Sequence, residues 1–240
     1  TRRKALRLFW KSVWPTMCRC LMQNIQAILF DLDDTLHDKS QNLLAFAQAQ
    51  FATCALADHG VELSQWTSQY VDLNNLRIEK TEVFARLQAA FKLNTSLADA
   101  LREDFDANSG AATRPLPGLH TLLQSCRARG MKIGIVTNGR DAFQRRKIAG
   151  LGIETTIDAI FTSGGFGVKK PDHRIFLACL AALGASPEAA IMVGDDFSAD
   201  MQPALELGMH TIWRSALSST RVKYWSDDLY AISAYLQQMA

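Results

Sequence analysis

The stretch Phe30-Asp31-Leu32-Asp33-Asp34-Thr35-Leu36 directly follows an apolar run at residues 25–29. The run predicts a buried strand, which places two acids, two residues apart, at the end of that strand. Alternate residues of an extended segment point the same way, so Asp31 and Asp33 are expected to project together from the carboxyl edge of a sheet. Open α/β sheets bind ligands at this edge. Crowded acids repel one another and lose hydration, which favours a bound divalent cation with oxygen ligands, in the first place Mg²⁺.

Three further motifs follow in order along the chain. They are Ile133-Gly134-Ile135-Val136-Thr137-Asn138-Gly139, then Lys169-Lys170-Pro171-Asp172, then Ile191-Met192-Val193-Gly194-Asp195-Asp196 with Asp200 behind it. The four motifs together resemble the haloacid dehalogenase superfamily of hydrolases, in the branch of phosphatases with a helical cap inserted after the first motif. The resemblance extends over residues 25 to 215, and four ordered motifs are far more specific than one.

The resemblance implies roles for the residues that match the motifs. Asp31 is the expected nucleophile, which forms an aspartyl-phosphate. The side chains of Asp31 and Asp195, with the backbone carbonyl of Asp33, are expected to hold Mg²⁺. Lys170 matches the family lysine that balances the charge of the nucleophile and the phosphate, and Lys169 is interpreted as its solvated neighbour.

Asp33 is the residue that favours phosphoryl transfer. An acid there can protonate a leaving alkoxide and later accept a proton from water, provided that its pKa lies above the roughly 3.9 of a free Asp. Haloalkanoate dehalogenases of the same superfamily lack this acid, because a halide leaving group needs no proton. The alternative, a turn residue, is weaker since Asp34 and Thr35 already supply turn chemistry.

Other polar residues complete the predicted site. The Thr137 hydroxyl and the following amides, including that of Asn138, can hold phosphoryl oxygens, although a capping threonine is the alternative. Asp196 and Asp200 fit an outer layer that orients metal-bound waters or Lys170, or are acids at a helix start. His37 lies at the first hinge and could contact substrate.

The segment 38–115 is predicted to be an all-helical cap. Ser40 is the expected N-cap of a helix that ends at Gly60, and apolar residues then repeat at helical spacing. Segments 36–39 and 115–118 are the expected hinges. The candidates for contacts to the leaving group, each equally interpretable as packing or surface, are Trp66, Tyr70, Asn74, Asn75 and Arg77.

Beyond residue 118, short apolar strands alternate with helices. Strands are predicted at residues 132–136, 159–162, 190–193 and, as the last, 210–213. This alternation indicates a parallel sheet with right-handed crossovers. The predicted fold class is therefore α/β, with a Rossmann-like doubly wound core at residues 25–37 and 116–240, a helical cap at 38–115, and an N-terminal extension of unknown role at 1–24.

Composition limits the function classes. The 240 residues are 48% hydrophobic with a net charge of +2, which gives no broad field for nucleic acid. Five scattered cysteines suit free thiols in a reducing compartment, so a cytoplasmic location is predicted. Residues 1–24 form a basic amphipathic stretch that could touch a membrane surface but is too short and too charged to span a bilayer.

These observations predict a magnesium-dependent phosphatase of the cytoplasm that hydrolyses small phosphate monoesters, such as a nucleotide, flavin mononucleotide or a sugar phosphate. Two alternatives stay open. One is a phosphomutase of the β-phosphoglucomutase type, which uses the same acids and protects the aspartyl-phosphate from water. The other is a non-catalytic phosphate-binding module. The natural ester and the oligomeric state are not fixed by the sequence.

Overall fold

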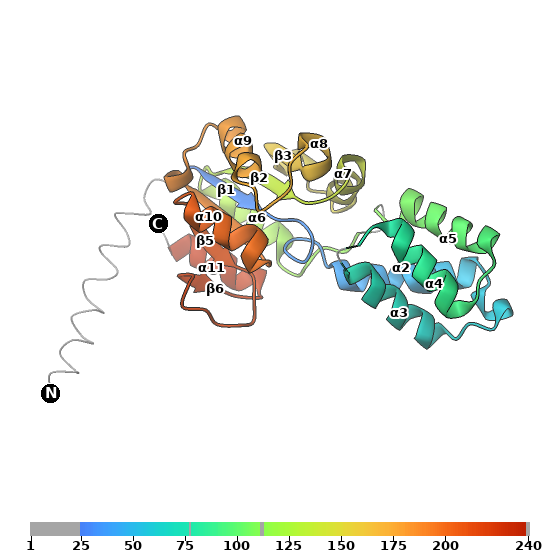
Figure 1. Cartoon of the computed structure of the whole chain (residues 1–240). Helices are drawn as coiled ribbons and strands as arrows, with labels where there is room; N and C mark the ends of the chain where they lie inside the picture. The colour runs from blue at the N-terminus through green and yellow to red at the C-terminus, as the bar shows by residue number, and fades with distance from the viewer. Residues whose placement is uncertain (1–24, 77, 111–112, 239–240) are drawn as a thin grey trace. The chain divides into compact units, whose positions relative to one another are not determined.

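The structure is a computed structural model that describes residues 25–76, 78–110 and 113–238 (Figure 1). The predicted extension at 1–24 and the candidate contact residue Arg77 lie outside these residues. The described chain forms two compact units. The first contains residues 25–36, 116–140 and 155–238, and the second contains residues 37–115 and 141–154. The second unit thus includes residues 141–154, which the predicted cap boundaries leave in the core.

The first unit is built on a six-stranded sheet in the order β3-β2-β1-β4-β5-β6, with every neighbouring pair parallel. Its strands are β1 (Ala27–Phe30), β2 (Lys132–Thr137), β3 (Ala159–Thr162), β4 (Ala190–Gly194), β5 (His210–Trp213) and β6 (Tyr224–Trp225). The strand order reverses at β1, whose Phe30 pairs with Ile135 of β2 on one side and Val193 of β4 on the other. Sheets of this kind bind ligands outside the carboxyl ends of the strands at the reversal.

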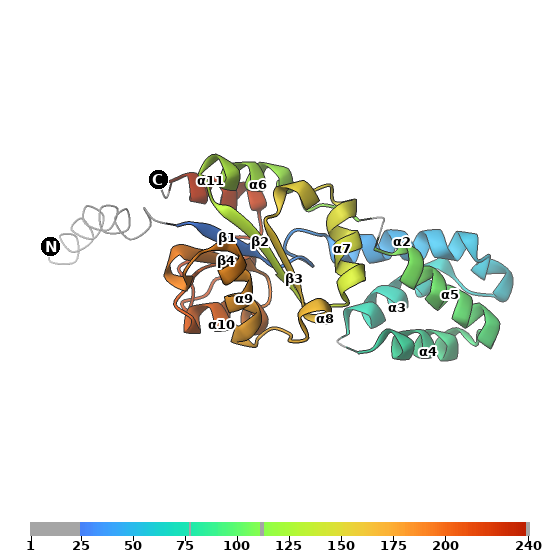
Figure 2. The same cartoon turned by 90° about the horizontal axis from the view of Figure 1, so that it is seen from above.

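Helices cover both faces of this sheet. Helices α6 and α11 pack together on one face, and α9 and α10 lie on the other (Figure 2). The elements of the first unit that cover the sheet or follow its strands are α6 (Leu119–Ala128), α8 (Ser163–Phe166), α9 (His173–Leu183), η3 (Pro187–Ala189), η4 (Phe197–Met201), α10 (Gln202–Glu206) and α11 (Leu229–Gln238). Strands β1 and β4 are buried along their whole length, as expected for uniformly apolar strands covered on both faces. The predicted doubly wound α/β core is confirmed.

Two elements extend this unit beyond the sequence prediction. The predicted last strand, β5, is followed by the two-residue strand β6 and the helix α11. A two-residue strand is too short to show alternation, which is why β6 has no signal in the sequence. Helix α11 packs against α6, and a buried hydrogen bond of 2.6 Å joins the hydroxyls of Ser125 and Ser233.

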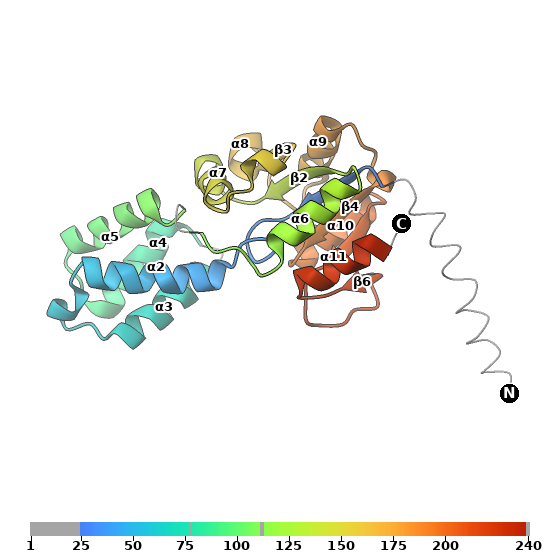
Figure 3. The same cartoon turned by 180° about the vertical axis from the view of Figure 1, so that it is seen from behind.

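The second unit is helical (Figure 3). Its helices are α2 (Lys39–Thr53), η1 (Leu56–His59), α3 (Leu63–Asn75), α4 (Lys80–Phe91), α5 (Thr95–Asn108) and α7 (Asp141–Gly150), and η2 (Glu154–Thr156) leads from α7 toward β3 along the chain. The predicted helix from Ser40 to Gly60 is wrong at both ends. Asp38 is the N-cap and accepts a hydrogen bond from the Gln41 amide at 2.9 Å. Helix α2 ends at Thr53, and Gly60 ends the separate helix η1.

An aromatic cluster forms the centre of this unit. Trp66 and Tyr70 are fully buried, with ring centroids 5.4 Å apart, and the Trp66 indole donates to the carbonyl oxygen of Ala47 at 3.0 Å. These two candidate contact residues are therefore packing residues. Phe143 of α7 stacks on Phe105 of α5 at 5.7 Å, which explains why α7 groups with these helices.

The two segments expected to be hinges pair with one another. His37 and Pro115 form an isolated antiparallel bridge. The amide of Asp38 donates to the carbonyl oxygen of Arg114 at 2.9 Å, and the amide of Leu116 donates to that of Leu36 at 3.0 Å. In the described part of the chain, no helix is both long and apolar enough to cross a membrane.

Candidate active site

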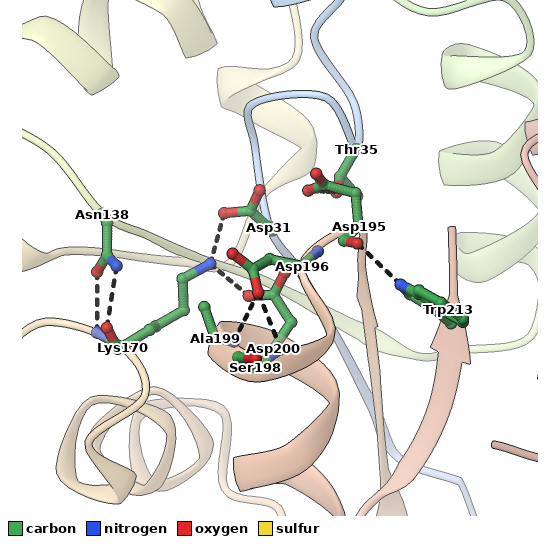
Figure 4. Close-up of polar contacts among 10 residues, drawn as sticks. All are labelled: Asp31, Thr35, Asn138, Lys170, Asp195, Asp196, Ser198, Ala199, Asp200 and Trp213. Carbon is green, nitrogen blue, oxygen red and sulfur yellow. Dashed lines mark hydrogen bonds and ion pairs between the residues drawn. The ribbon is translucent and has the colours of Figure 1, made fainter. Parts of the chain in front are cut away.

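Acidic side chains gather where β1 and β4 end (Figure 4). Asp31 directly follows β1, and its amide donates to the carbonyl oxygen of Val193 in β4 at 2.9 Å. The hydrogen bonds between β1 and β4 therefore fix the backbone position of Asp31. Asp195 directly follows β4. Carboxylate oxygens of Asp31, Asp195 and Asp200 lie within 4.8 Å of one another. The strand order therefore brings Asp31 close to two acids that are more than 160 residues away from it in sequence.

A buried lysine is held against two of these acids. The Lys170 ammonium donates to Asp31 Oδ1 at 2.5 Å and to Asp200 Oδ1 at 2.7 Å, and the residue is 5% exposed. The Asn138 side chain fixes the main chain of Lys170, because Asn138 Oδ1 accepts from the Lys170 amide at 2.8 Å and Nδ2 donates to the Lys170 carbonyl at 3.1 Å. Lys169 is exposed. Of the two lysines, only Lys170 reaches the acids.

The two acids expected in an outer layer have different positions. Asp200 is 1% exposed, and Asp200 Oδ2 accepts from the Asp196 amide at 3.1 Å. A Cβ atom at Gly194 would lie 2.6 Å from Asp200 Cβ, so this close approach requires glycine. The Asp196 carboxylate instead accepts from the amides of Ser198 and Ala199 at 2.9 and 3.0 Å and caps helix η4.

Burial dominates the electrostatics of the acids. It raises the pKa of Asp31 well above its ordinary value, and Lys170 opposes this change. Burial, followed by the charges of Asp200 and Asp34, raises the pKa of Asp195 to about 6. Burial lowers the pKa of Lys170, but the carboxylates of Asp200 and Asp31 together raise this pKa by more, so the ammonium stays charged.

One ammonium compensates only part of the charge of three carboxylates. The remaining negative charge and the oxygen-only donor set of Asp31, Asp195 and Asp200 suit a hard divalent cation. A cation at this position would favour the charged form of the acids and lower their pKa values. The acidic cluster thus has the chemistry required of a metal site.

Three contacts at this site have no clear signal in the sequence. Thr35 Oγ1 donates to Asp195 Oδ1 at 3.1 Å. The Trp213 indole donates to the carbonyl oxygen of Asp195 at 2.8 Å, and Arg214 Nη1 donates to that of Asp34 at 2.6 Å. The sequence contains only an indirect signal for the last two contacts. Trp213 and Arg214 stand at the carboxyl end of β5, the strand that pairs with β4.

The remaining predicted residues occupy different environments. Asp33 is half-buried, two residues beyond Asp31. Thr137 is the buried last residue of β2, the strand that neighbours β1. His37 is 1% exposed and belongs to the second unit. The chemical roles assigned to these residues from the sequence stay predictions.

Comparisons with known proteins agree with this architecture. The sequence pattern of the haloacid dehalogenase-like hydrolases matches residues 28–214. A glyceraldehyde 3-phosphate phosphatase of Methanothermobacter thermautotrophicus is 31% identical over 194 residues, which are 78% of this chain and 84% of that protein. An enzyme of the same name from Methanocaldococcus jannaschii is 29% identical over 86% of this chain and 91% of its own length.

Solved structures show the same fold. The magnesium-bound HAD-hydrolase YfnB of Bacillus subtilis superposes with a TM-score of 0.69 at 20% identity, over 89% of this chain and 99% of that one. A HAD phosphatase of Thermococcus onnurineus gives a TM-score of 0.62 at 24% identity, over 88% and 97%. The curated phosphatases confirm the predicted enzyme class, a phosphoric monoester hydrolase. The chain belongs to the haloacid dehalogenase-like hydrolases.

Proposed function

We propose that this phosphatase hydrolyses small phosphate monoesters with Mg²⁺ and an aspartyl-phosphate formed on Asp31. The observation that carries the proposal is the position of the Asp31 carboxylate, which lies at the reversal of the sheet with Lys170 on one oxygen and Asp195 nearby. A nucleophile at this edge can meet a phosphoryl group that enters from the carboxyl ends of the strands.

The residues that would hold the metal are the side chains of Asp31 and Asp195 and the backbone carbonyl of Asp33. When bound, Mg²⁺ neutralises part of the phosphate charge and orients a phosphoryl oxygen. Lys170 adds a fixed positive charge beside the nucleophile. Asp200 keeps that ammonium in place because it accepts its second hydrogen bond.

The proposed reaction proceeds in two displacements. In the first, an Asp31 carboxylate oxygen bonds to phosphorus, the ester P–O bond breaks, and Asp33 donates its proton to the departing alkoxide. In the second, Asp33 accepts a proton from water, the water oxygen bonds to phosphorus, and the acyl-phosphate bond breaks. Inorganic phosphate and the free Asp31 carboxylate are the products. The amide of Asn138 and the hydroxyl of Thr137 are the proposed donors to phosphoryl oxygens.

Asp33→Asn should separate substrates by leaving group. We expect kcat to fall by about 100-fold or more on alkyl phosphates, whose alkoxides need a proton, and less on an activated aryl phosphate. Parallel assays of glycerol phosphate and p-nitrophenyl phosphate measure the difference. Single-turnover kinetics show whether formation of the aspartyl-phosphate limits both reactions. Equal losses in that first step on both esters would remove Asp33 from the acid role.

The proposed substrate class comes from the relatives and from the chemistry of the site. Several curated relatives are named for glyceraldehyde 3-phosphate, which is a small alkyl phosphate monoester. We include sugar phosphates, nucleotides and flavin mononucleotide in the class, because the described acids and Lys170 recognise only the phosphoryl group. The helical residues 38–115 are proposed as the cap that selects among these esters.

Asn75→Ala tests the proposed cap. Contacts of Trp66 and Tyr70 in α3 with Ala47 and Phe46 in α2 show that the two helices run antiparallel, so the exposed Asn75 lies at the hinge end of this unit. We expect kcat/KM for the preferred natural ester to change about 10-fold, with acetyl phosphate unaffected. Gln65→Ala, at the opposite end of α3, is the matched control. Parallel changes on both substrates would assign these helices a structural role instead.

The function itself is tested with a panel of phosphate esters, assayed with Mg²⁺ and after chelation. We expect phosphate release with Mg²⁺, loss of release with the chelator, and recovery when Mg²⁺ is restored. Ca²⁺ should substitute poorly because its coordination is larger and looser. Release that persists in metal-free, folded protein would contradict the metal-dependent mechanism. A requirement for a sugar bisphosphate would instead identify a phosphomutase.

We also propose a cytoplasmic location. Cys54, Cys126 and Cys179, the cysteines within the described residues, are all free, which suits a reducing compartment. Burial raises the pKa of Cys126 and of Cys179 to about 12, so both remain unreactive thiols. Fractionation of cells that express the tagged chain tests this location, and recovery from an oxidising compartment would contradict it.

A further inference from the structure

Side chains at the end of β5 form hydrogen bonds with both the loop after β1 and the loop after β4, which carry acids of the site. The Trp213 indole donates to the carbonyl oxygen of Asp195 at 2.8 Å (Figure 4). The next residue, Arg214, donates from Nη1 to the carbonyl oxygen of Asp34 at 2.6 Å. The Arg214 amide in turn donates to the carbonyl oxygen of Gly194 at 2.8 Å, and this bond fixes the backbone position of Arg214. Two consecutive side chains therefore each support a different loop of the site.

The loop that Arg214 contacts has a strained backbone. Asp34 has a φ of 55°, in the left-handed region that non-glycine residues rarely adopt. The Leu36 amide closes this turn onto the carbonyl oxygen of Leu32 at 2.9 Å. A guanidinium that donates to the Asp34 carbonyl stabilises the strained conformation, because hydrogen bonds from a charged donor are strong.

The contacts form a closed circuit that joins the two loops carrying the proposed metal ligands. Thr35, which follows the strained residue, donates from Oγ1 to Asp195 Oδ1 at 3.1 Å. The circuit thus runs from Arg214 to Asp34, through Thr35 to Asp195, and back to Trp213. Its effect is to fix the first motif and Asp195 at one separation, and the proposed metal ligands belong to these two loops.

The Trp213 ring packs against a second aromatic side chain. It contacts Phe197 edge-on, with ring centroids 5.6 Å apart and an interplanar angle of 79°. The Arg221 guanidinium lies over the Phe197 ring, 3.7 Å from its centroid. Phe197 is also the first residue of helix η4, which carries Asp200. This packing limits the positions that the indole N–H can take.

We propose that Arg214, together with Trp213, is a positioning residue that sets the affinity of the site for its divalent cation. The inference rests on the proposed function, since it assigns the circuit to the same metal. Neither side chain is a proposed ligand, and both act through backbone carbonyl groups. Removing a residue that orients metal ligands without itself binding the metal typically changes metal affinity by about 10–100-fold.

The test is calorimetric titration of the folded chain with Mg²⁺, without substrate. Arg214→Ala should weaken Mg²⁺ binding about 10-fold or more. Arg214→Lys keeps a charged donor and should recover part of the affinity. Trp213→Phe removes only the indole N–H while it keeps the aromatic packing, and it should also weaken binding. Arg174→Ala, which removes an exposed guanidinium paired with Asp172, is the matched control and should bind as the wild type does.

Thermal melting of each metal-free variant separates positioning from general stability. A wild-type chain that binds Mg²⁺ while Arg214→Ala and Trp213→Phe bind it equally well would overturn the inference and leave the proposed function standing. Wild-type protein that binds no Mg²⁺ would overturn both. If Arg214→Ala does not fold, the Arg214→Lys and Trp213→Phe titrations decide, and unchanged affinity in both contradicts the inference.

Discussion

Asp31→Asn is expected to abolish turnover while the protein stays folded. An amide cannot form the aspartyl-phosphate, so kcat should fall by about 10⁴-fold or more, the scale seen when other enzymes lose a nucleophile. The fold should tolerate the change, because burial disfavours a charge at residue 31 and the Lys170 ammonium keeps its contact with Asp200. Steady-state assays with p-nitrophenyl phosphate and thermal melting measure the two effects.

The control for this experiment is Asp227→Asn. Asp227 is exposed and belongs to the same unit, so its substitution removes one charge at the surface of that unit. Its activity and melting temperature should match those of the wild type. Asp31→Asn protein that melts within about 4 °C of the wild type and still turns over at a tenth of its rate would exclude Asp31 as the nucleophile.

Lys170→Met should affect both activity and stability. Removing one partner of a buried ion pair leaves the other charge uncompensated, which typically costs about 3–5 kcal/mol of unfolding free energy. Here the ammonium contacts both Asp31 and Asp200, so both carboxylates lose their partner. We expect a loss in kcat of about 100-fold or more as well, because the positive charge beside the nucleophile disappears.

Melting with Mg²⁺ and a matched variant test whether the ion pairs of Lys170 account for the expected loss of stability. Mg²⁺ should raise the melting temperature of Lys170→Met more than that of the wild type, because the cation replaces part of the missing positive charge. Lys169→Met is the control, since that side chain is exposed and should change stability by no more than about 0.5 kcal/mol. If both variants lost stability equally, the ion pairs of Lys170 would not explain the effect.

The fold and the acids could be predicted because their signals are local. Asp31 and Asp195 each follow a short apolar run directly, and a parallel sheet brings the ends of such runs to one edge. Lys170 could be named from its motif, but its advantage over Lys169 depends on the two hydrogen bonds that its main chain forms with the Asn138 side chain. Such tertiary contacts leave no pattern in the sequence.

Other features depended on long-range packing and could not be predicted. The stack of Phe143 on Phe105 places α7 with the cap helices, although its sequence position suggests a core crossover. Both Asp38 and Ser40 are capping residue types, and Asp38 is selected because its amide already pairs with Arg114 beside the hinge. The contact of Arg214 with Asp34 requires knowledge that β5 neighbours β4 and of a specific rotamer.

The central claim is that Asp31 carries the phosphoryl group during turnover. The most direct measurement is an acid quench of the working enzyme with Mg²⁺ and acetyl phosphate, followed by peptide mass spectrometry. The account predicts a phosphorylated peptide with the group on Asp31, formed and lost at rates that match turnover and absent in Asp31→Asn. A wild-type enzyme that releases phosphate while Asp31 stays unmodified at every quench time, with the group found on another residue, would contradict it.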